Sequence, residues 1–324
     1  MPESVLEIDD LTIRFHLKRG GLTAVDGVSL DVKRGETFGL VGESGSGKTV
    51  TARSIMRLIP TPPGEIVKGQ IRFEGENVFD KSDAEMRALR GKKIAMVFQE
   101  PMSALNPVFS VGAQITDALR TNLGMNKREA RERCIELLQL VGIPSPERRI
   151  DSYVHEFSGG MRQRVMLAMA LSCNPNFLIA DEPTTALDVT IQATILELIE
   201  SMIERFHMSL IFITHNLGVV AHACDRIGVM YASHLVELGD KNEIFRNPQH
   251  PYTVGLLNSI PRLDAQTEFL TPIDGLVCNM LDPPEGCKFN PRCPHAMDIC
   301  RREIPPMREV APGHYAACHL HSQD

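Results

Sequence analysis

The hydrophobic pattern of the chain alternates between two periods and predicts a mixed α/β fold. Residues 6–15 and 27–32 alternate apolar with polar side chains, which predicts strands of an antiparallel sheet. Short apolar runs predict buried strands, and their expected ranges are 37–41, 70–73, 94–98, 178–181, 210–214 and 226–231. Because helical stretches separate many of these runs, we expect a parallel sheet with helices on both faces.

Helical periodicity marks residues 50–59, 111–141 and 161–171. Pro60 is expected to end the first helix, because proline lacks the N–H group that a helix interior requires. The helical stretch at about residues 99–177 lies between two expected strands, so we interpret it as an inserted subdomain. Residues 249–324 are rich in proline and lack long periodic segments, which indicates a loop-rich appendage to the domain of residues 1–248.

Composition and charge count against several classes of protein. The 324 residues carry a formal net charge of −7, which gives no support to a nucleic-acid partner, since phosphate backbones need a basic surface. The longest apolar run, residues 165–171, is far shorter than the roughly 18 residues of a membrane span. No secretory signal is visible, so we expect a cytoplasmic protein that reaches any membrane through partners.

A glycine-rich segment at residues 42–49 fits the pattern G-x-x-x-x-G-K-S/T between an expected strand and an expected helix. Glycines in such a loop allow consecutive N–H groups to turn toward phosphate oxygens. Lys48 would reach the β- and γ-phosphates of ATP, and Thr49 would place its hydroxyl on Mg²⁺. The expected nucleotide-binding residues here are Gly42, Ser44, Gly45, Ser46, Gly47, Lys48 and Thr49.

Four further polar residues stand at the ends of expected strands. Asp181 would hold Mg²⁺, and the next residue, Glu182, would act as the base or orient the attacking water. Gln99 follows another strand, where a neutral amide can touch both Mg²⁺ and the water. His215 follows the strand at residues 210–214, where an imidazole can bond a γ-phosphate oxygen. These residues predict an ATP-hydrolysing site.

Together these segments resemble the ATP-binding subunits of ABC transporters over about residues 5–248. The matching motifs are the phosphate loop, the Q-loop at Gln99, the signature Phe157-Ser158-Gly159-Gly160-Met161, the acidic strand ending at Asp181 and Glu182, the D-loop Ala186-Leu187-Asp188 and the switch His215. The resemblance implies a P-loop ABC ATPase fold with a parallel-sheet core, an N-terminal antiparallel β-subdomain, an inserted α-helical subdomain and a loop-rich C-terminal appendage.

The resemblance also implies a head-to-tail pair of subunits. Ser158, Gly159 and Gly160 would then bind the γ-phosphate held on the partner's phosphate loop, and Asp188 would lie at the nucleotide. Phe15 has the position of the family's adenine-stacking aromatic, and its alternative is a core-facing strand residue.

Three residues depart from the family pattern. Phe157, Met161 and Asn216 stand where the family usually has Leu, Gln and Asp. Because Met161 removes a polar side chain near the partner's nucleotide, a regulatory subunit with one non-hydrolysing site stays open as an alternative.

Residues 250–253, 256–261 and 99–107 resemble the corresponding segments of oligopeptide and dipeptide importers. Met161 is similar to the D-type subunit of dipeptide importers, which pairs with a distinct F-type ATPase subunit, so a heterodimer is expected. The other implied partners are two transmembrane permease subunits and, indirectly, an extracytoplasmic peptide-binding protein. The implied location is peripheral, at the cytoplasmic face of the inner membrane.

Two other readings of the function stay open. Importers of nickel, antimicrobial peptides or glutathione share much of the importer pattern. A soluble ABC protein acting on nucleic acid or the ribosome is a further alternative, which the acidic balance and the single ATPase unit disfavour.

Five of the eight cysteines lie between Cys278 and Cys318. In a cytoplasmic protein, such a cluster indicates metal rather than disulfides. Cys287, Cys293, Cys300 and Cys318 could hold a four-iron four-sulfur (4Fe-4S) cluster, a reading that the resemblance strengthens. Zinc is the alternative, with nitrogen ligands from His295, His314 and His319, and free thiols or a disulfide are the third possibility.

Overall fold

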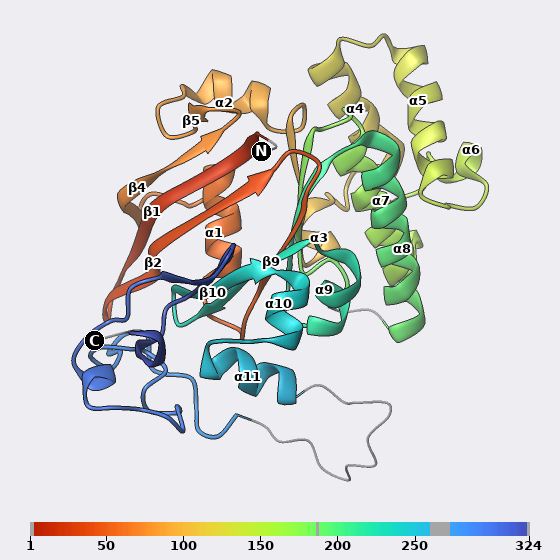
Figure 1. Cartoon of the computed structure of the whole chain (residues 1–324). Helices are drawn as coiled ribbons and strands as arrows, with labels where there is room; N and C mark the ends of the chain where they lie inside the picture. The colour runs from red at the N-terminus through yellow and green to blue at the C-terminus, as the bar shows by residue number, and fades with distance from the viewer. Residues whose placement is uncertain (1–2, 186–187, 260–272, 323–324) are drawn as a thin grey trace. The chain divides into compact units, whose positions relative to one another are not determined.

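The computed structural model describes residues 3–185, 188–259 and 273–322. They divide into two compact units, and Figure 1 labels many of the elements of both. The first unit contains the chain up to residue 79 and again from residue 212, and the second unit contains residues 80–211. Strand β8 (Ser209–Thr214) contains the second boundary.

An antiparallel sheet opens the first unit. Strand β1 (Ser4–Leu17) lies between β2 (Gly20–Lys33) and β4 (Gly64–Phe73), and β5 (Glu76–Asn77) follows at the edge. Residue Ile13 faces Val25 on one side and Ile66 on the other. The alternating pattern of residues 6–15 and 27–32 therefore predicted strands correctly, although both are longer in the structure.

A second group of strands in the first unit leads to the glycine-rich loop. Strand β3 (Thr37–Val41) pairs in parallel with β9 (Arg226–Tyr231), and every residue of β3 is buried. Strand β10 (His234–Asp240) is antiparallel to β9 and to β12 (His314–Ala316), which in turn pairs with β11 (Arg308–Ala311). The C-terminal residues thus extend this sheet. The remaining helices of this unit are α1 (Lys48–Ile55), α9 (Leu217–Ala223), α10 (Lys241–Arg246) and α11 (Pro251–Asn258).

A buried carboxylate fixes the C-terminal part of the first unit. Glu237 is fully buried on β10 and accepts hydrogen bonds from the backbone N–H groups of Gln249 and His250, at 2.7 and 3.0 Å. Its Oε1 also lies 2.8 Å from Nε2 of buried His314 on β12. Because a buried charge needs partners, these bonds hold β10, β12 and the start of α11 together.

The second unit combines a parallel strand pair with helices. Strands β6 (Ile94–Val97) and β7 (Phe177–Asp181) pair in parallel and are buried throughout, as expected of strands covered on both faces. Helices α4, α5 and α7 pack on one another in this unit (Figure 1). The helices are α2 (Asp83–Leu89), α3 (Pro101–Ala104), α4 (Val111–Leu123), α5 (Lys127–Leu140), α6 (Pro146–Arg149), α7 (Gly159–Leu171) and α8 (Val189–Phe206).

Two helix expectations are corrected by local backbone structure. The stretch at residues 111–141 is two helices, because Gly124 ends α4 in the left-handed conformation and Asn126 starts α5. The Asn126 side chain accepts from the N–H of Glu129, whose carboxylate accepts from the N–H of Asn126, which is a capping box. Helix α1 ends at Ile55 rather than residue 59, and Arg57 has a φ of 48°.

Within the described ranges, the structure contains no helix with the length and hydropathy of a membrane span.

Candidate functional site

The glycine-rich loop of the first unit connects β3 to α1, as expected. Gly42 has a φ of 152°, and a Cβ atom there would overlap the carbonyl oxygen of Met230, so only glycine fits. Gly47 is the N-cap of α1 with a φ of 103°. The loop therefore opens a helix, and a helix N-terminus favours anions through its free N–H groups and its dipole.

Lys48 folds back across the loop instead of pointing into solvent. Its Nζ donates to the carbonyl oxygens of Gly42 and Glu43, at 2.7 and 2.9 Å. Only 4% of Lys48 is exposed, and its Nζ is 3.4 Å from Oγ of buried Ser46. A cation held above the loop backbone suits a polyphosphate, so the donor set of residues 42–49 fits the expected nucleotide.

Two proposed catalytic residues meet in the second unit. Nε2 of Gln99 donates to Oε2 of Glu182 at 3.0 Å, and Oγ1 of Thr185 donates to the same oxygen at 2.8 Å. Glu182 has a φ of 46°, and non-glycine residues in this strained region cluster at functional sites. Asp181, at the end of β7, is 1% exposed. The arrangement places a carboxylate, which can accept a proton from water, beside an amide, which can orient that water.

The expected signature residues form the start of α7 in the second unit. Ser158 is the N-cap, and its side chain accepts from the N–H of Met161 at 3.4 Å. Gly159 and Gly160 are the first two helical residues. Asp188 caps α8 in the same way, accepting from the N–H of Ile191 at 3.0 Å. The other two D-loop residues, Ala186 and Leu187, lie outside the described residues.

Phe15 and His215 belong to the first unit. Phe15 lies on β1, is partly exposed, and faces Leu22 and Gly64 on the neighbouring strands. His215 is the first residue after β8. The expected residues of the ATP site therefore belong to both units, with Phe15, the loop at residues 42–49 and His215 in the first and the others in the second.

The C-terminal part of the first unit supplies a contact that the sequence did not predict. Arg292 forms an ion pair with Glu43 of the phosphate loop, with Nη1 2.8 Å from Oε2. This bond to Glu43 raises the pKa of Arg292, so its guanidinium stays charged. Burial and the nearby charge of His321 lower the pKa of His250 to about 3, so that imidazole stays neutral. The sequence motif around Cys293 suggested only metal chemistry and gave no signal for the ion pair.

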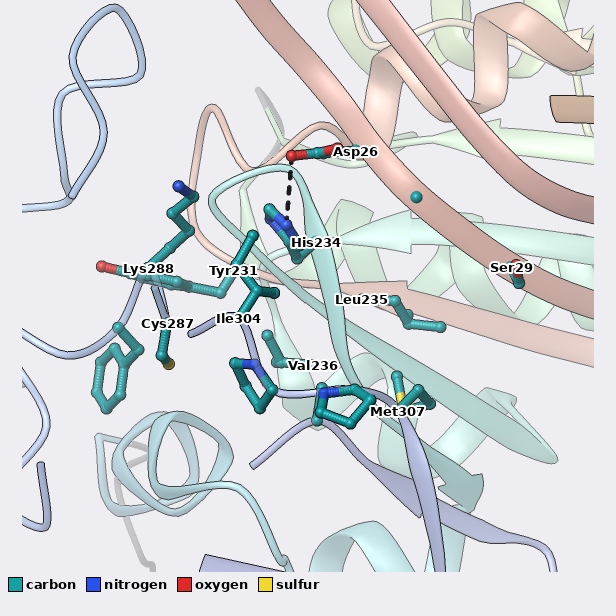
Figure 2. A pocket seen from close by; sticks show the side chains of 15 residues that line it. Asp26, Ser29, Tyr231, His234, Leu235, Val236, Cys287, Lys288, Ile304 and Met307 are labelled. Carbon is teal, nitrogen blue, oxygen red and sulfur yellow. Dashed lines mark ion pairs between the residues drawn. The ribbon is translucent and has the colours of Figure 1, made fainter. Parts of the chain in front are cut away.

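A cavity of about 340 Å³ lies in the first unit (Figure 2). Its lining includes Asp26 and His234, which form an ion pair at 3.4 Å, together with Tyr231 and Cys287. The other labelled residues are Ser29, Leu235, Val236, Lys288, Ile304 and Met307. No residue of the phosphate loop lines this cavity, so it is separate from the expected nucleotide position.

The four expected metal-binding cysteines lie near one another in the first unit. Burial, with a smaller contribution from the nearby Cys300, Cys318 and Cys293, raises the pKa of Cys287 to about 11, although a backbone hydrogen bond at Phe289 opposes this rise. Over the described ranges, however, no three His, Cys, Asp or Glu side chains form a group that could hold a metal ion. The cysteines are close together, but they are not arranged as ligands for the expected iron–sulfur cluster.

The structure does not support the zinc alternative either, because two of its proposed ligands have other hydrogen-bond partners. Nε2 of His314 bonds to buried Glu237, and Nε2 of His319 lies 2.9 Å from the carbonyl oxygen of Glu303. Among the described residues, the side chains at these cysteines are therefore not arranged to hold a metal ion.

Comparisons with known families match two parts of the chain. Residues 25–185 match the family described as "ABC transporter". Residues 236–300 match "Oligopeptide/dipeptide transporter, C-terminal region".

Individual relatives match over almost the whole length. The dipeptide transport ATP-binding protein DppD of Bacillus subtilis (strain 168) is 50% identical over 99% of this chain and 96% of its own. The oligopeptide transport ATP-binding protein OppD of the same organism is 52% identical over 96% of this chain and 87% of its own.

Among solved structures, the ATP-binding cassette MJ0796, in a dimeric post-hydrolysis state bound to ADP and Pi, has a TM-score of 0.65 and 26% identity. The match covers 73% of this chain and 98% of that one. This likeness confirms the expected ABC ATPase fold.

Proposed function

Because this chain belongs to the ABC transporter family and carries the C-terminal region of oligopeptide and dipeptide transporters, we propose that it hydrolyses ATP to power peptide import through a membrane permease. One observation carries the proposal. A phosphate loop closed by Lys48 and a peptide-transporter C-terminal region occur in a single chain that resembles DppD and OppD over nearly its full length. Nickel and glutathione are the alternative substrates.

The chemistry assigns a role to each site residue. Lys48 binds the β- and γ-phosphates, and Thr49, Gln99 and Asp181 would hold Mg²⁺, which would neutralise phosphate charge. Glu182 accepts a proton from the attacking water, which Gln99 orients. His215 bonds a γ-phosphate oxygen, and Phe15 stacks on adenine. The Gln99–Glu182 hydrogen bond supports the pairing of amide and carboxylate.

The proposed assembly is a pair of ATPase subunits that meet head to tail. Ser158, Gly159 and Gly160 complete the site on the partner's phosphate loop, with Asp188 at the nucleotide. Since Met161 departs from the usual glutamine, we propose that the partner is a distinct F-type ATPase chain. Two transmembrane permease subunits hold the pair peripherally at the cytoplasmic face of the inner membrane, and an extracytoplasmic binding protein delivers the peptide.

Replacement of the proposed base tests the hydrolysis mechanism. In the assembled transporter, Glu182→Gln should retain ATP binding and lose nearly all hydrolysis, because the amide accepts no proton. ATP turnover and ATP binding are measured on the same preparation. Glu197→Gln is the matched control, since Glu197 is exposed on α8 and should leave both quantities unchanged. Normal turnover by Glu182→Gln would show that the base assignment is wrong.

Uptake measurements test the substrate. Membrane vesicles containing the complete transporter and its binding protein should accumulate labelled dipeptides or oligopeptides when ATP is supplied on the cytoplasmic side. Labelled nickel and labelled glutathione are tested in parallel. ATP-dependent uptake of either one without peptide uptake would replace the peptide assignment.

An iron–sulfur cluster on Cys287, Cys293, Cys300 and Cys318 remains a separate proposal. The closeness of the four thiols supports it, although their present arrangement fits no metal ion. Protein purified without oxygen should be coloured and contain about four iron atoms per chain if a 4Fe-4S cluster forms. A colourless, iron-free protein would exclude the cluster, and bound zinc would select the alternative.

A further inference from the structure

One residue of the phosphate loop is held by the C-terminal part of the same unit. The carboxylate of Glu43 accepts two hydrogen bonds from the guanidinium of Arg292, at 2.8 Å from Nη1 and 3.2 Å from Nη2. The Arg292 side chain is 5% exposed and that of Glu43 is 28% exposed. A two-point bond of this kind fixes orientation as well as distance, and its burial protects it from salt.

The backbone of Glu43 extends this connection on both sides. Its N–H donates to Oη of Tyr252, the second residue of α11, at 2.9 Å. Its carbonyl oxygen accepts from Nζ of Lys48 at 2.9 Å. Glu43 therefore joins two C-terminal side chains to the lysine that is expected to bind the phosphates.

The C-terminal side of this connection is closely packed. The Arg292 guanidinium lies over the rings of Tyr231 and Phe289, with ring-centre distances of 5.8 and 5.9 Å. The Tyr231 and Tyr252 rings are 4.6 Å apart, and those of Tyr252 and Phe289 are 5.5 Å apart. Arg292 also donates to the carbonyl oxygens of Asp274 and Ile273, at 3.0 and 3.3 Å. The guanidinium is thus enclosed by rings and hydrogen-bonded on several sides.

We propose that Arg292 and Tyr252 are positioning residues that hold the phosphate loop, through Glu43, in the conformation that binds ATP. The C-terminal region then sets the affinity of the chain for ATP, in addition to any role toward partners. This inference rests on the proposed binding of ATP by residues 42–49. It predicts a weaker affinity for ATP with an unchanged rate at saturating ATP. A loop that leaves its binding conformation binds ATP less tightly, while the catalytic carboxylate stays intact.

The test measures ATP affinity and turnover in the full chain within the assembled transporter. If Arg292→Gln leaves the loop competent for about a tenth of the time, the Kd and the KM for ATP rise about tenfold. The kcat at saturating ATP should stay within about twofold of the unaltered protein, because ATP selects the competent loop. Arg292→Lys keeps the charge but not the two-point bond, so the Kd and the KM for ATP should rise less than in Arg292→Gln.

Two further variants separate positioning from general stability. Glu43→Gln should raise the KM as Arg292→Gln does, and the double variant should be no worse than Arg292→Gln alone, since both act through one bond. Arg226→Gln is the matched control, because Arg226 forms a partly buried ion pair with Asp31 and Glu36 in the same unit. It should lower the melting temperature and leave the KM unchanged.

Three results would overturn the inference. They are an unchanged KM in Arg292→Gln, an equal rise in Arg226→Gln, and additive effects in the double variant. Failure of the unaltered protein to bind ATP would instead refute the proposed function, so the two failures are distinguishable. If Arg292→Gln does not fold, ATP titration of Arg292→Lys decides, and an unchanged Kd in that variant counts against the proposal.

Discussion

Acidification should destabilise the first unit through the buried imidazole of His250. Only 1% of His250 is exposed, and its Nδ1 accepts the N–H of Tyr252 at 3.0 Å as the N-cap of α11. That acceptor role requires the neutral ring, and burial lowers the pKa of His250 to about 3. In the unfolded chain, the pKa is about 6.5, so the unfolded state takes up the proton first.

The size of the effect follows from the two pKa values. At about pH 5, His250 is protonated in the unfolded chain and neutral in the folded one, so unfolding is favoured by about 2 kcal/mol relative to about pH 7.5. This value is set mainly by the pKa in the unfolded chain, because folded His250 stays neutral at that pH. The stability contributed by the neutral ring is complete above about pH 6.5 and declines as the pH falls toward about 3.

Urea unfolding at the two pH values measures this difference. The chain has no tryptophan, and three of its four tyrosines, Tyr231, Tyr252 and Tyr315, lie in the first unit, so tyrosine fluorescence reports that unit. His250→Asn is the control, because asparagine keeps an N-cap acceptor and does not titrate. Between about pH 7.5 and pH 5, the free energy of unfolding should fall by about 2 kcal/mol more in the unaltered protein than in this variant. Equal losses, within about 0.5 kcal/mol, would refute the reasoning.

Three substitutions test other parts of the structure. Phe289→Ala empties the centre of the aromatic cluster, so it should cost about 3–5 kcal/mol of stability, measured by urea unfolding, whereas a loss below about 1 kcal/mol would contradict its packing role. Asn126→Ala removes the capping box with Glu129 and should cost about 1 kcal/mol, and an unchanged melting temperature of the second unit would speak against it. Gly42→Ala should abolish ATP binding in titrations with a fluorescent ATP analogue, because the new methyl group overlaps the carbonyl oxygen of Met230. Wild-type affinity in that variant would contradict the geometry of the loop.

Local sequence patterns predicted the structure correctly where the conformation depends on short segments. The apolar run at residues 37–41 and the glycine-rich segment after it predicted β3 and the loop before α1, because backbone conformation there depends on the residues themselves. Caps were less visible in the hydrophobic pattern. A continuous helical periodicity concealed the break at Gly124 and Asn126, since the polar residues that end one helix and begin the next also fit a solvated helix face.

Cysteine spacing illustrates a limit of motif reasoning. It led to the prediction of a metal cluster on Cys287, Cys293, Cys300 and Cys318, and the structure does place these thiols near one another. Spacing does not fix the directions of the side chains, however, and the described residues contain no group arranged to hold a metal.

The sequence alone was enough to predict the α/β class, the phosphate loop, the two acids at the end of β7 and the peptide-transporter character of the C-terminal region. Packing of the folded chain was needed to show that Glu237 joins β10, β12 and α11, and that Arg292 holds Glu43 of the phosphate loop from 249 positions away. Glycine loops and strand periodicity are predictable because they are local properties of the chain. The partner of a buried charge, by contrast, is whichever group the packed chain brings within hydrogen-bond distance.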